Sequence, residues 1–321
     1  MAIDILNIKP TVISRDLRGK YVLLYGKAKS GKTTAAAQFP KALLVAFEKG
    51  YNAIGGLRAQ DVMKWSDFKM IIRQLEKPEA QQMYETIIID TVSIAWEMVE
   101  QFVCQQNSVQ KISDIPWGGG YTACKKEFEG ALRKITQLGY GIVLIAHNAT
   151  RIEKTADGSE IEIISPELPK RAAEICNGIV DIIGYIGNEY KDGENHRYLY
   201  TRETPTLFAG SRFKYLAPKI KFGYKELVDA IGEAIDKAEQ LDGATVVEKN
   251  EFVAEKSRSF EEVQEEAKSL WTRLVERDPD NARRILKKVE MIFGRPMKLS
   301  EIQEDQVDLY ELVVLDMRDM M

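Results

Sequence analysis

The sequence predicts an α/β protein with a mainly parallel sheet, β-hairpin additions and a small all-α module at its C-terminal end. Two observations support this prediction. Short, nearly all-apolar runs alternate with helical patterns over residues 1–236, and strands that are covered on both faces of a parallel sheet have that composition. Residues 259–321 instead carry apolar side chains at helical spacing, after a polar and weakly patterned linker over residues 237–258.

Four apolar runs are expected to form the strands of the core, and they span residues 21–25, 42–47, 86–89 and 141–146. Helical patterns near residues 91–106 and 121–138 lie between them. A further helix is expected at residues 169–178, before a strand at 181–186. Antiparallel strands are expected at residues 197–202 and 215–220, which give the core a β-rich end.

The C-terminal module is expected to consist of short helices with identifiable ends. Ser259 with Glu262, and Ser300 with Gln303, have the spacing of a capping box. Residues 278–280 read Asp-Pro-Asp and are expected to end the first helix. The module therefore reads as a separate helical unit behind the α/β core.

Composition excludes several classes of protein. The 321 residues are 45% hydrophobic and 29% charged with a formal net charge of −4, as in ordinary globular proteins. No apolar run reaches the ~18 residues of a membrane span, and the first residues show no signal-peptide pattern. Three isolated cysteines form neither a zinc pattern nor a disulfide framework, so a cytoplasmic location is expected, in the host cell if a phage encodes the chain. Any site for a polyanion must be local, because the chain is not basic overall.

Residues 26–33 read G-K-A-K-S-G-K-T and match the phosphate-loop pattern G-x-x-x-x-G-K-[ST] between a predicted strand and a predicted helix. Backbone N–H groups of such a loop point at phosphates, helped by the positive end of the helix. Lys32 is expected to reach the β- and γ-phosphates of ATP, and the Thr33 hydroxyl to ligate Mg²⁺. The expected ATP contacts are Gly26, Lys27, Ala28, Lys29, Ser30, Gly31, Lys32, Thr33 and Thr34.

Polar residues at the ends of three other predicted strands complete the expected site. Asp90 follows a strand and is expected to hold Mg²⁺ through water, although an aspartate there is also a good helix N-cap. The next residue is Thr91, where many ATPases carry the carboxylate that activates water. Glu48 is the best replacement, on the expectation that its strand lies beside the phosphate loop. His147 is expected to sense the γ-phosphate from the other side.

Together these residues resemble the RecA-like ATPases. The closer resemblance is to phage-encoded core-only recombinases, the RecA-like group of Sak-type single-strand annealing proteins. In RecA the catalytic base is a glutamate at the end of the strand after the loop, which matches Glu48. Residues 114–121 (D-I-P-W-G-G-G-Y) and Ala146-His147 are similar to motifs of the phage group. The resemblance covers residues 15–235, and a core-only protein would lack the C-terminal module.

The resemblance implies that two mobile loops bind single-stranded DNA. Their counterparts are residues 109–121 and 148–169. Aromatic and basic side chains on such loops suit base stacking and phosphate contact, whereas the acids of the second loop weaken that interpretation. The expected DNA contacts are Lys111, Trp117, Tyr121, Arg151 and Lys154. Trp117 and Tyr121 could alternatively be packed anchors.

The resemblance also implies a cation supplied by a neighbouring subunit. Residues 209–215 read A-G-S-R-F-K-Y and are similar to the K-x-R element of hexameric relatives, with Arg212 at the arginine position. Gly210 replaces the lysine, and Lys214 could compensate. A cation acting in trans implies a homo-oligomer, either a ring or a filament. In the C-terminal module, one helix face is basic and is interpreted as solvated in preference to DNA-binding. Its residues are Arg283, Arg284, Lys287 and Lys288.

The sequence is therefore interpreted as an ATP- and Mg²⁺-dependent DNA-stimulated ATPase, with slow turnover. It would bind single-stranded DNA and promote annealing or strand exchange in phage recombination, with a single-strand DNA-binding protein as a further candidate partner and no membrane partner. Three alternatives stay open. They are a DNA motor or helicase loader, a small-molecule kinase, for which no Arg-rich lid is visible, and a nucleotide-binding scaffold that hydrolyses slowly.

Overall fold

In the computed structural model, the chain forms two compact units, Met1–Ala254 and Glu255–Met321. The structure describes residues 12–15, 17, 19–154, 158–248 and 258–321. Residues 155–157 of the second expected DNA loop and residues 249–257 of the expected linker lie outside this description. In the described part, no helix has both the length and the apolar composition needed to cross a membrane.

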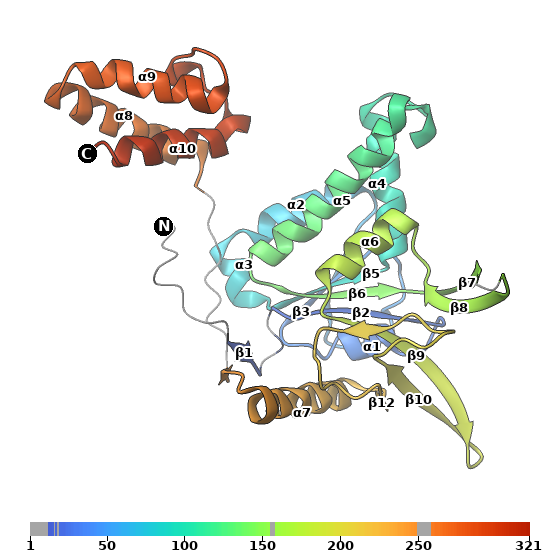
Figure 1. The fold of residues 1–321 in the computed structure, drawn as a ribbon. Coiled ribbons are helices and arrows are strands. Elements are labelled where there is room, and N and C mark those ends of the chain that lie inside the picture. Colours follow the sequence, from blue (N-terminus) through green and yellow to red (C-terminus); the bar gives the residue numbers. More distant parts are fainter. Residues whose placement is uncertain (1–11, 16, 18, 155–157, 249–257) are drawn as a thin grey trace. The chain divides into compact units, whose positions relative to one another are not determined.

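One large sheet forms the centre of the first unit, and the described residues contribute nine strands to it (Figure 1). Eight strands follow the order β12-β10-β9-β2-β6-β5-β3-β4, and β11 pairs with β9. The pairs from β9 to β4 are parallel, whereas β10, β11 and β12 pair antiparallel. The strands are β2 (Tyr21–Gly26), β3 (Ala42–Ala46), β4 (Arg58–Asp61), β5 (Thr86–Asp90), β6 (Gly141–Ala146), β9 (Ile182–Lys191), β10 (Glu194–Tyr200), β11 (Gly210–Ser211) and β12 (Lys219–Lys221).

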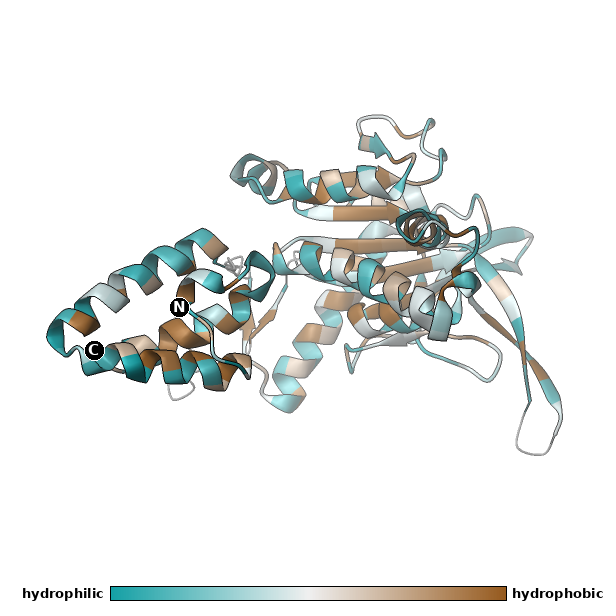
Figure 2. Cartoon of the chain, turned by 90° about the horizontal axis from the view of Figure 1, so that it is seen from above, coloured by the Kyte–Doolittle hydropathy of each residue, from teal (hydrophilic) through white to brown (hydrophobic). Residues whose placement is uncertain are grey.

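Helices cover both faces of this sheet, which explains why its central strands are buried at nearly every position and largely apolar. Successive residues of one strand alternate between two cores: Leu23 packs with α2, α4, α5 and α6, and Leu24 packs with α1 and α7. Figure 2 shows the apolar strands between helices whose outer faces are polar. The helices are α1 (Lys32–Ala36), α2 (Trp65–Leu75), α3 (Pro78–Met83), α4 (Val92–Gln106), α5 (Gly119–Gln137), α6 (Lys170–Ile179) and α7 (Tyr224–Asp242).

Several elements project from this layered core or join its ends (Figure 1). Two short 3₁₀ helices, η2 (Ile112–Asp114) and η3 (Pro116–Gly118), connect the projecting ends of α4 and α5. β7 (Asn148–Lys154) and β8 (Glu160–Pro166) form an antiparallel hairpin. β1 (Ile13–Ser14) pairs in parallel with β13 (Val246–Val247).

Four local expectations were wrong. The second expected DNA loop is mostly the β7–β8 hairpin, because Asn148 pairs with Pro166 and the ladder runs to Lys154. Tyr121 lies in helix α5 and not in a loop. The strand expected at residues 215–220 is only β12, because Phe213 and Leu216 close a turn before it. The expected linker begins too early, because α7 continues to Asp242.

The second unit is a helical module with its own apolar core. Its helices are α8 (Phe260–Arg277), α9 (Asp280–Phe293) and α10 (Val307–Arg318), with 3₁₀ turns η4 (Leu299–Glu301) and η5 (Glu304–Gln306). The capping box before α8 is confirmed: the Glu262 N–H donates to Ser259 Oγ at 3.2 Å, and the Ser259 N–H donates to Glu262 Oε2 at 3.0 Å. The pair Ser300 and Gln303 is not a capping box, because Gln303 instead caps η5 with Gln306. The predicted fold class, α/β with a mainly parallel sheet, hairpin additions and C-terminal helices, is confirmed.

Candidate nucleotide site and nucleic-acid surface

The phosphate loop joins β2 to α1 and depends on two glycines with positive φ. Gly26 has φ 156°, and a Cβ there would lie 2.8 Å from the carbonyl oxygen of Ile186 on the neighbouring strand β9. Gly31 has φ 91°, in the left-handed region that side chains rarely adopt. The local chain path therefore needs glycine at both positions, independently of any ligand.

Two buried polar groups fit this loop for phosphate. The Lys32 ammonium donates to the carbonyl oxygens of Gly26 and Lys27, each at 2.9 Å. Burial lowers the pKa of Lys32, against the opposing effect of the nearby Asp90 and Glu48 carboxylates. The Ser30 hydroxyl is buried and has no hydrogen-bond partner among the described residues. A phosphate oxygen is the kind of partner that an orphaned hydroxyl and a buried ammonium both require.

The two residues expected to bind Mg²⁺ meet directly. Thr33 Oγ1 donates to Asp90 Oδ2 at 2.7 Å, from the first turn of α1 to the last residue of β5. Burial raises the pKa of Asp90, and the Thr33 hydrogen bond and the nearby Lys32 oppose this shift. No cluster of three metal-ligating side chains occurs in the described part of the chain. One carboxylate and one hydroxyl nevertheless fit Mg²⁺, which keeps several waters and takes phosphate oxygens as ligands.

Glu48 reaches this site by a different route from the one expected. Its strand β3 does not lie beside the phosphate-loop strand β2, because β5 and β6 separate them. The Glu48 N–H instead donates to the carbonyl oxygen of Asp90 at 3.0 Å, across the β3–β5 pair. Glu48 Oε2 then lies 3.5 Å from Nε2 of His147, at the end of β6. The structure thus brings together Lys32, Asp90, Glu48 and His147 at the carboxyl edge of the sheet.

A hollow of about 560 Å³ adjoins the Glu48–His147 pair. It is lined on its far side by Arg151 and by residues that follow the β7–β8 hairpin. The Glu167 N–H donates to the carbonyl oxygen of His147 at 2.9 Å, and Arg151 Nη2 donates to the Leu168 carbonyl at 2.8 Å. The hairpin therefore begins directly after His147, and the residue that follows its second strand is hydrogen-bonded back to His147.

The structure places two further side chains beside the loop that sequence reasoning missed. Arg197 of β10 donates from Nη1 to the Ser30 carbonyl at 3.4 Å. A Cβ on Gly31 would lie 3.2 Å from this guanidinium and 3.5 Å from the ring of Phe222. Among the described residues, no carboxylate lies within 4 Å of the Arg197 side-chain nitrogens. Only the antiparallel pairing of β9 and β10 brings Arg197 here, and no local motif signals it.

The expected DNA contacts lie on projecting elements. The Trp117 side chain is 102% exposed and its φ is 59°, so it is not a packed anchor. Tyr121 is 38% exposed, and the Arg171 guanidinium of α6 lies 5.0 Å from the centre of its ring. Lys111 and Lys154 are exposed, as is Arg151 apart from its hydrogen bond to Leu168. Sequence reasoning missed Arg171, which joins the helix α5 to the helix α6.

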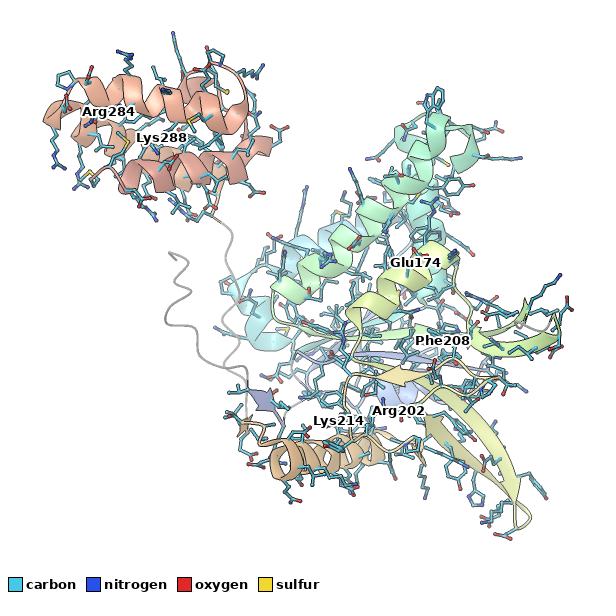
Figure 3. The ribbon with its side chains drawn as sticks, viewed as in Figure 1. Glu174, Arg202, Phe208, Lys214, Arg284 and Lys288 are labelled. Atoms are coloured by element: carbon cyan, nitrogen blue, oxygen red, sulfur yellow. The ribbon has the colours of Figure 1, made fainter. Side chains whose placement is uncertain are left out.

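Arg212 and Lys214 do not approach the phosphate loop of their own chain. Arg212 Nη1 lies 3.1 Å from Asp181 Oδ1, and Asp181 also accepts from the N–H of Tyr21, the first residue of β2. The loop follows the last residue of that strand, so Arg212 lies at the opposite, amino edge. Lys214, labelled in Figure 3, lies 2.9 Å from Asp242 Oδ1.

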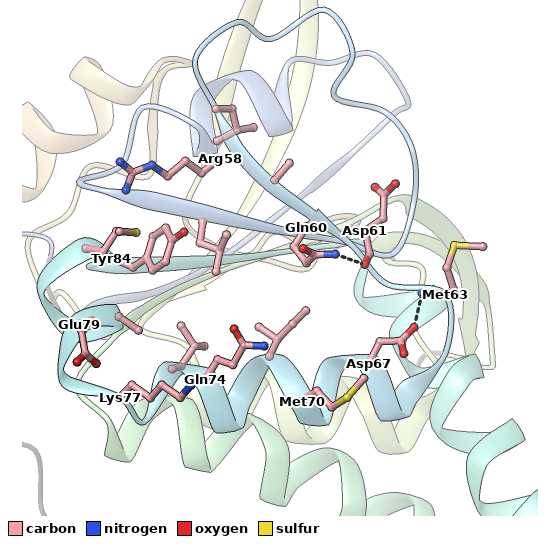
Figure 4. A pocket seen from close by; sticks show the side chains of 17 residues that line it. Arg58, Gln60, Asp61, Met63, Asp67, Met70, Gln74, Lys77, Glu79 and Tyr84 are labelled. Carbon is pink, nitrogen blue, oxygen red and sulfur yellow. Dashed lines mark hydrogen bonds between the residues drawn. The ribbon is translucent and has the colours of Figure 1, made fainter.

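A larger hollow, of about 1100 Å³, lies away from these residues (Figure 4). It is bounded by the edge strand β4 and by α2 and α3. Its size does not make it the nucleotide site, because the phosphate loop and Asp90 contribute nothing to its lining.

Known proteins are similar to this chain over different shares of its length. A family model described as an AAA domain matches residues 18–213. The SPbeta prophage-derived uncharacterized protein YorG of Bacillus subtilis (strain 168) is 28% identical over 333 residues, covering 100% of this chain and 99% of that protein. The solved structure of the KaiC-like protein PH0186 from Pyrococcus horikoshii OT3 covers 64% of this chain and 85% of its own, at 17% identity and a TM-score of 0.36. The family match includes every residue of the site from the loop to His147, and also Arg212.

Proposed function

We propose, from the premise that this chain belongs to the AAA domain family of P-loop NTPases, that it is a DNA-stimulated ATPase of phage homologous recombination. It would bind ATP and Mg²⁺, hold single-stranded DNA, and promote annealing or strand exchange. The observation that carries the proposal is the position of the Glu48–His147 pair, which adjoins the hollow that the β7–β8 hairpin borders.

Each residue of the site has a role in this proposal. Lys32 and the loop N–H groups would bind the β- and γ-phosphates, and Thr33 and Asp90 would hold Mg²⁺. When bound, Mg²⁺ neutralises negative charge on the phosphate oxygens. Glu48 would orient the attacking water and accept its proton. His147 would report the γ-phosphate to the hairpin through its carbonyl hydrogen bond to Glu167.

Single-stranded DNA would lie across the projecting elements. Trp117 is free for a base to stack on, and the Tyr121–Arg171 pair offers a second aromatic face beside a cation. Stacking and phosphate contact together are how proteins hold single strands without reading sequence. DNA bound at Arg151 and Lys154 would contact the hairpin that adjoins His147. This arrangement supports coupling between DNA binding and hydrolysis.

The phage assignment and the oligomer rest on separate arguments. The relative that matches over the full length is named as prophage-derived, which supports a phage role here. Arg212 lies at the sheet edge opposite the loop, so it could serve only the site of a neighbouring subunit in a ring or filament. Lys214 is the second candidate for that role. A single-strand DNA-binding protein is a further proposed partner.

The test is ATP hydrolysis with and without a single-stranded oligonucleotide, with duplex DNA for comparison and Lys32→Ala as the blank. We expect stimulation by the single strand, little by the duplex, and no activity in the blank. No stimulation, together with no DNA binding in the presence of ATP, would overturn the DNA role and favour a kinase or a scaffold. Directional movement along DNA in a translocation assay would favour a motor instead.

A further inference from the structure

We propose that the C-terminal module binds a short acidic peptide that carries an apolar anchor residue. The proposed site, termed here the module groove, consists of two hollows that share Leu286 and Lys298 in their lining. The groove lies within the module alone. The proposal therefore does not depend on the nucleotide site or on DNA binding.

The floor of the groove is apolar and partly open. Trp271 of α8, Leu286 of α9 and Leu299 of η4 line a hollow of about 570 Å³. Trp271 is half-buried against the module core, and Leu286 is 37% exposed. Apolar hollows of this size with a few polar groups at the edge are typical ligand sites. An aliphatic or aromatic side chain would cover the exposed faces of these residues.

The rim of the groove carries more cations than acids, four against two. Lys268, Arg283, Lys287 and Lys298 line the two hollows, and among the described residues none has a carboxylate within 4 Å of its side-chain nitrogens. Arg258, Arg284, Lys288 and Arg318 of the module each have a carboxylate within 4 Å, whereas Arg273 and Arg295, which line neither hollow, have none among the described residues. Lys288, labelled in Figure 3, lies 3.0 Å from Asp316.

The placement of these cations is informative because the module is acidic overall. Residues 251–321 contain 17 acids and 12 bases, a net charge of −5. Acids are therefore abundant, yet the lining of the two hollows contains two of them, Glu290 and Glu301, against four cations. Charge complementarity points to an anionic ligand there.

A peptide fits the groove better than a nucleic acid does. The floor is filled by an apolar side chain, which the sugar-phosphate backbone does not provide. Glu290 and Glu301 also line the second hollow, and they would repel a continuous run of phosphates. A peptide of a few acids can place each carboxylate at one cation and avoid these two side chains. Arg283 and Lys287, two of the four residues of the basic face that is expected to be solvated, would thus contact a specific ligand.

The test uses the full chain and a fluorescein-labelled peptide of four aspartates followed by isoleucine and phenylalanine, measured by fluorescence anisotropy. Lys287→Glu and Lys298→Glu should each weaken binding at least about fivefold, because each replaces an attraction by a repulsion. Arg273→Glu is the matched control, since it makes the same charge change at an exposed position that does not line the groove. It should change affinity by less than about twofold. Circular dichroism checks that every variant is folded.

Two further peptides and one competitor complete the test. A peptide with asparagines in place of the aspartates, and one with alanines in place of the two apolar residues, should both bind at least about tenfold more weakly. A single-stranded oligonucleotide should not displace the acidic peptide. Equal binding of the asparagine peptide, equal weakening by Arg273→Glu, or displacement by the oligonucleotide would each overturn the proposal.

Discussion

At the carboxyl edge of the central sheet, Thr33, Asp90 and Glu48 meet from three different elements, whereas at the amino edge Arg212 is bound to Asp181 beside the start of β2. Both edges carry cations and carboxylates. At the carboxyl edge the charges are partly buried, and the pKa values of Lys32 and Asp90 are shifted by burial. At the amino edge Arg212 is exposed, and its donors are used by Asp181 and by backbone carbonyls.

The difference in burial and pairing distinguishes charges suited to bind a ligand from charges that only stabilise the fold. Burying a charged group costs free energy unless the group is paired. Among the described residues, Asp90 accepts a single side-chain hydrogen bond, from Thr33, and it lies near a second carboxylate, Glu48. These buried charges cost free energy in the protein alone, and bound phosphates and a cation would supply the partners that they lack. Arg212 instead bridges an acid and the end of helix α6 and stabilises the fold locally.

The largest expected effect is that of replacing Arg212. It would overturn the comparison, because it would show that a residue of the amino edge acts in catalysis at the site of another subunit. If Arg212 acts in trans, Arg212→Ala should lower the rate of ATP hydrolysis by about 10³-fold, as loss of an arginine finger does. Mixing it with Lys32→Ala should restore activity, since some interfaces then combine an intact loop with an intact arginine. Phosphate release measures both. Normal activity of Arg212→Ala would leave the residue a purely structural role.

Glu48→Gln tests the carboxyl edge directly. We expect kcat to fall by about 10²-fold, because the variant loses the general base, while ATP binding is retained. The Glu48 side chain is 45% exposed, so thermal stability should not change. Glu167→Gln is the matched control, since Glu167 lines the same hollow and should leave kcat nearly unaltered. Comparable losses in the two variants would show that the hollow needs negative charge in general and not a base at Glu48.

Trp117→Ala tests the proposed DNA-binding surface, which lies on elements that project from the sheet. We expect single-stranded DNA to bind about tenfold more weakly, because one stacking platform is lost. The temperature of unfolding should not change, because the side chain is fully exposed. Tyr190→Ala is the matched control: Tyr190 is 80% exposed on the other hairpin, β9–β10. Anisotropy of a labelled oligonucleotide measures both, and equal losses would mean that exposed aromatics bind DNA without a defined site.

The carboxyl edge could be predicted from sequence because each of its parts is local. The phosphate loop has a fixed spacing. Asp90 and His147 each follow an apolar run, and the carboxyl ends of parallel strands lie at the same edge of a sheet. Strand order was not local, so the neighbour of β3 was predicted wrongly even though Glu48 reaches the site. Arg197 could not be predicted, because it depends on the register of an antiparallel pair.

Contacts between residues far apart in the sequence also limit what could be predicted for the proposed DNA-binding surface. Arg171 stacks on Tyr121 only because helices α5 and α6 pack together, and their sequence separation hides that contact. The resemblance alone places a loop at residues 148–169, and the sequence of β7 has no apolar alternation that argues against it. In β8, Ile161, Ile163 and Ile164 are partly buried and Ser165 and Pro166 are buried, whereas β7 is mainly exposed. Hydrophobic periodicity reports burial, and it is silent where a strand buries neither face.

The smallest expected effect is on the free energy of unfolding, which should respond differently to substitution at Asp90 and at Asp181. Because burial raises the pKa of Asp90, the folded chain binds more protons than the unfolded chain between the ordinary pKa and the raised one. The free energy of unfolding should therefore fall as pH rises through that window, so the ionised carboxylate costs stability at neutral pH. Without nucleotide or Mg²⁺, Asp90→Asn should unfold at a higher urea concentration at pH 7, and this difference should vanish in acid. Asp181→Asn should show no such gain, because it weakens the ion pair with Arg212. A loss of stability in Asp90→Asn at every pH would mean that the Thr33 hydrogen bond outweighs burial, and that the two edges are held together by the same kind of contact.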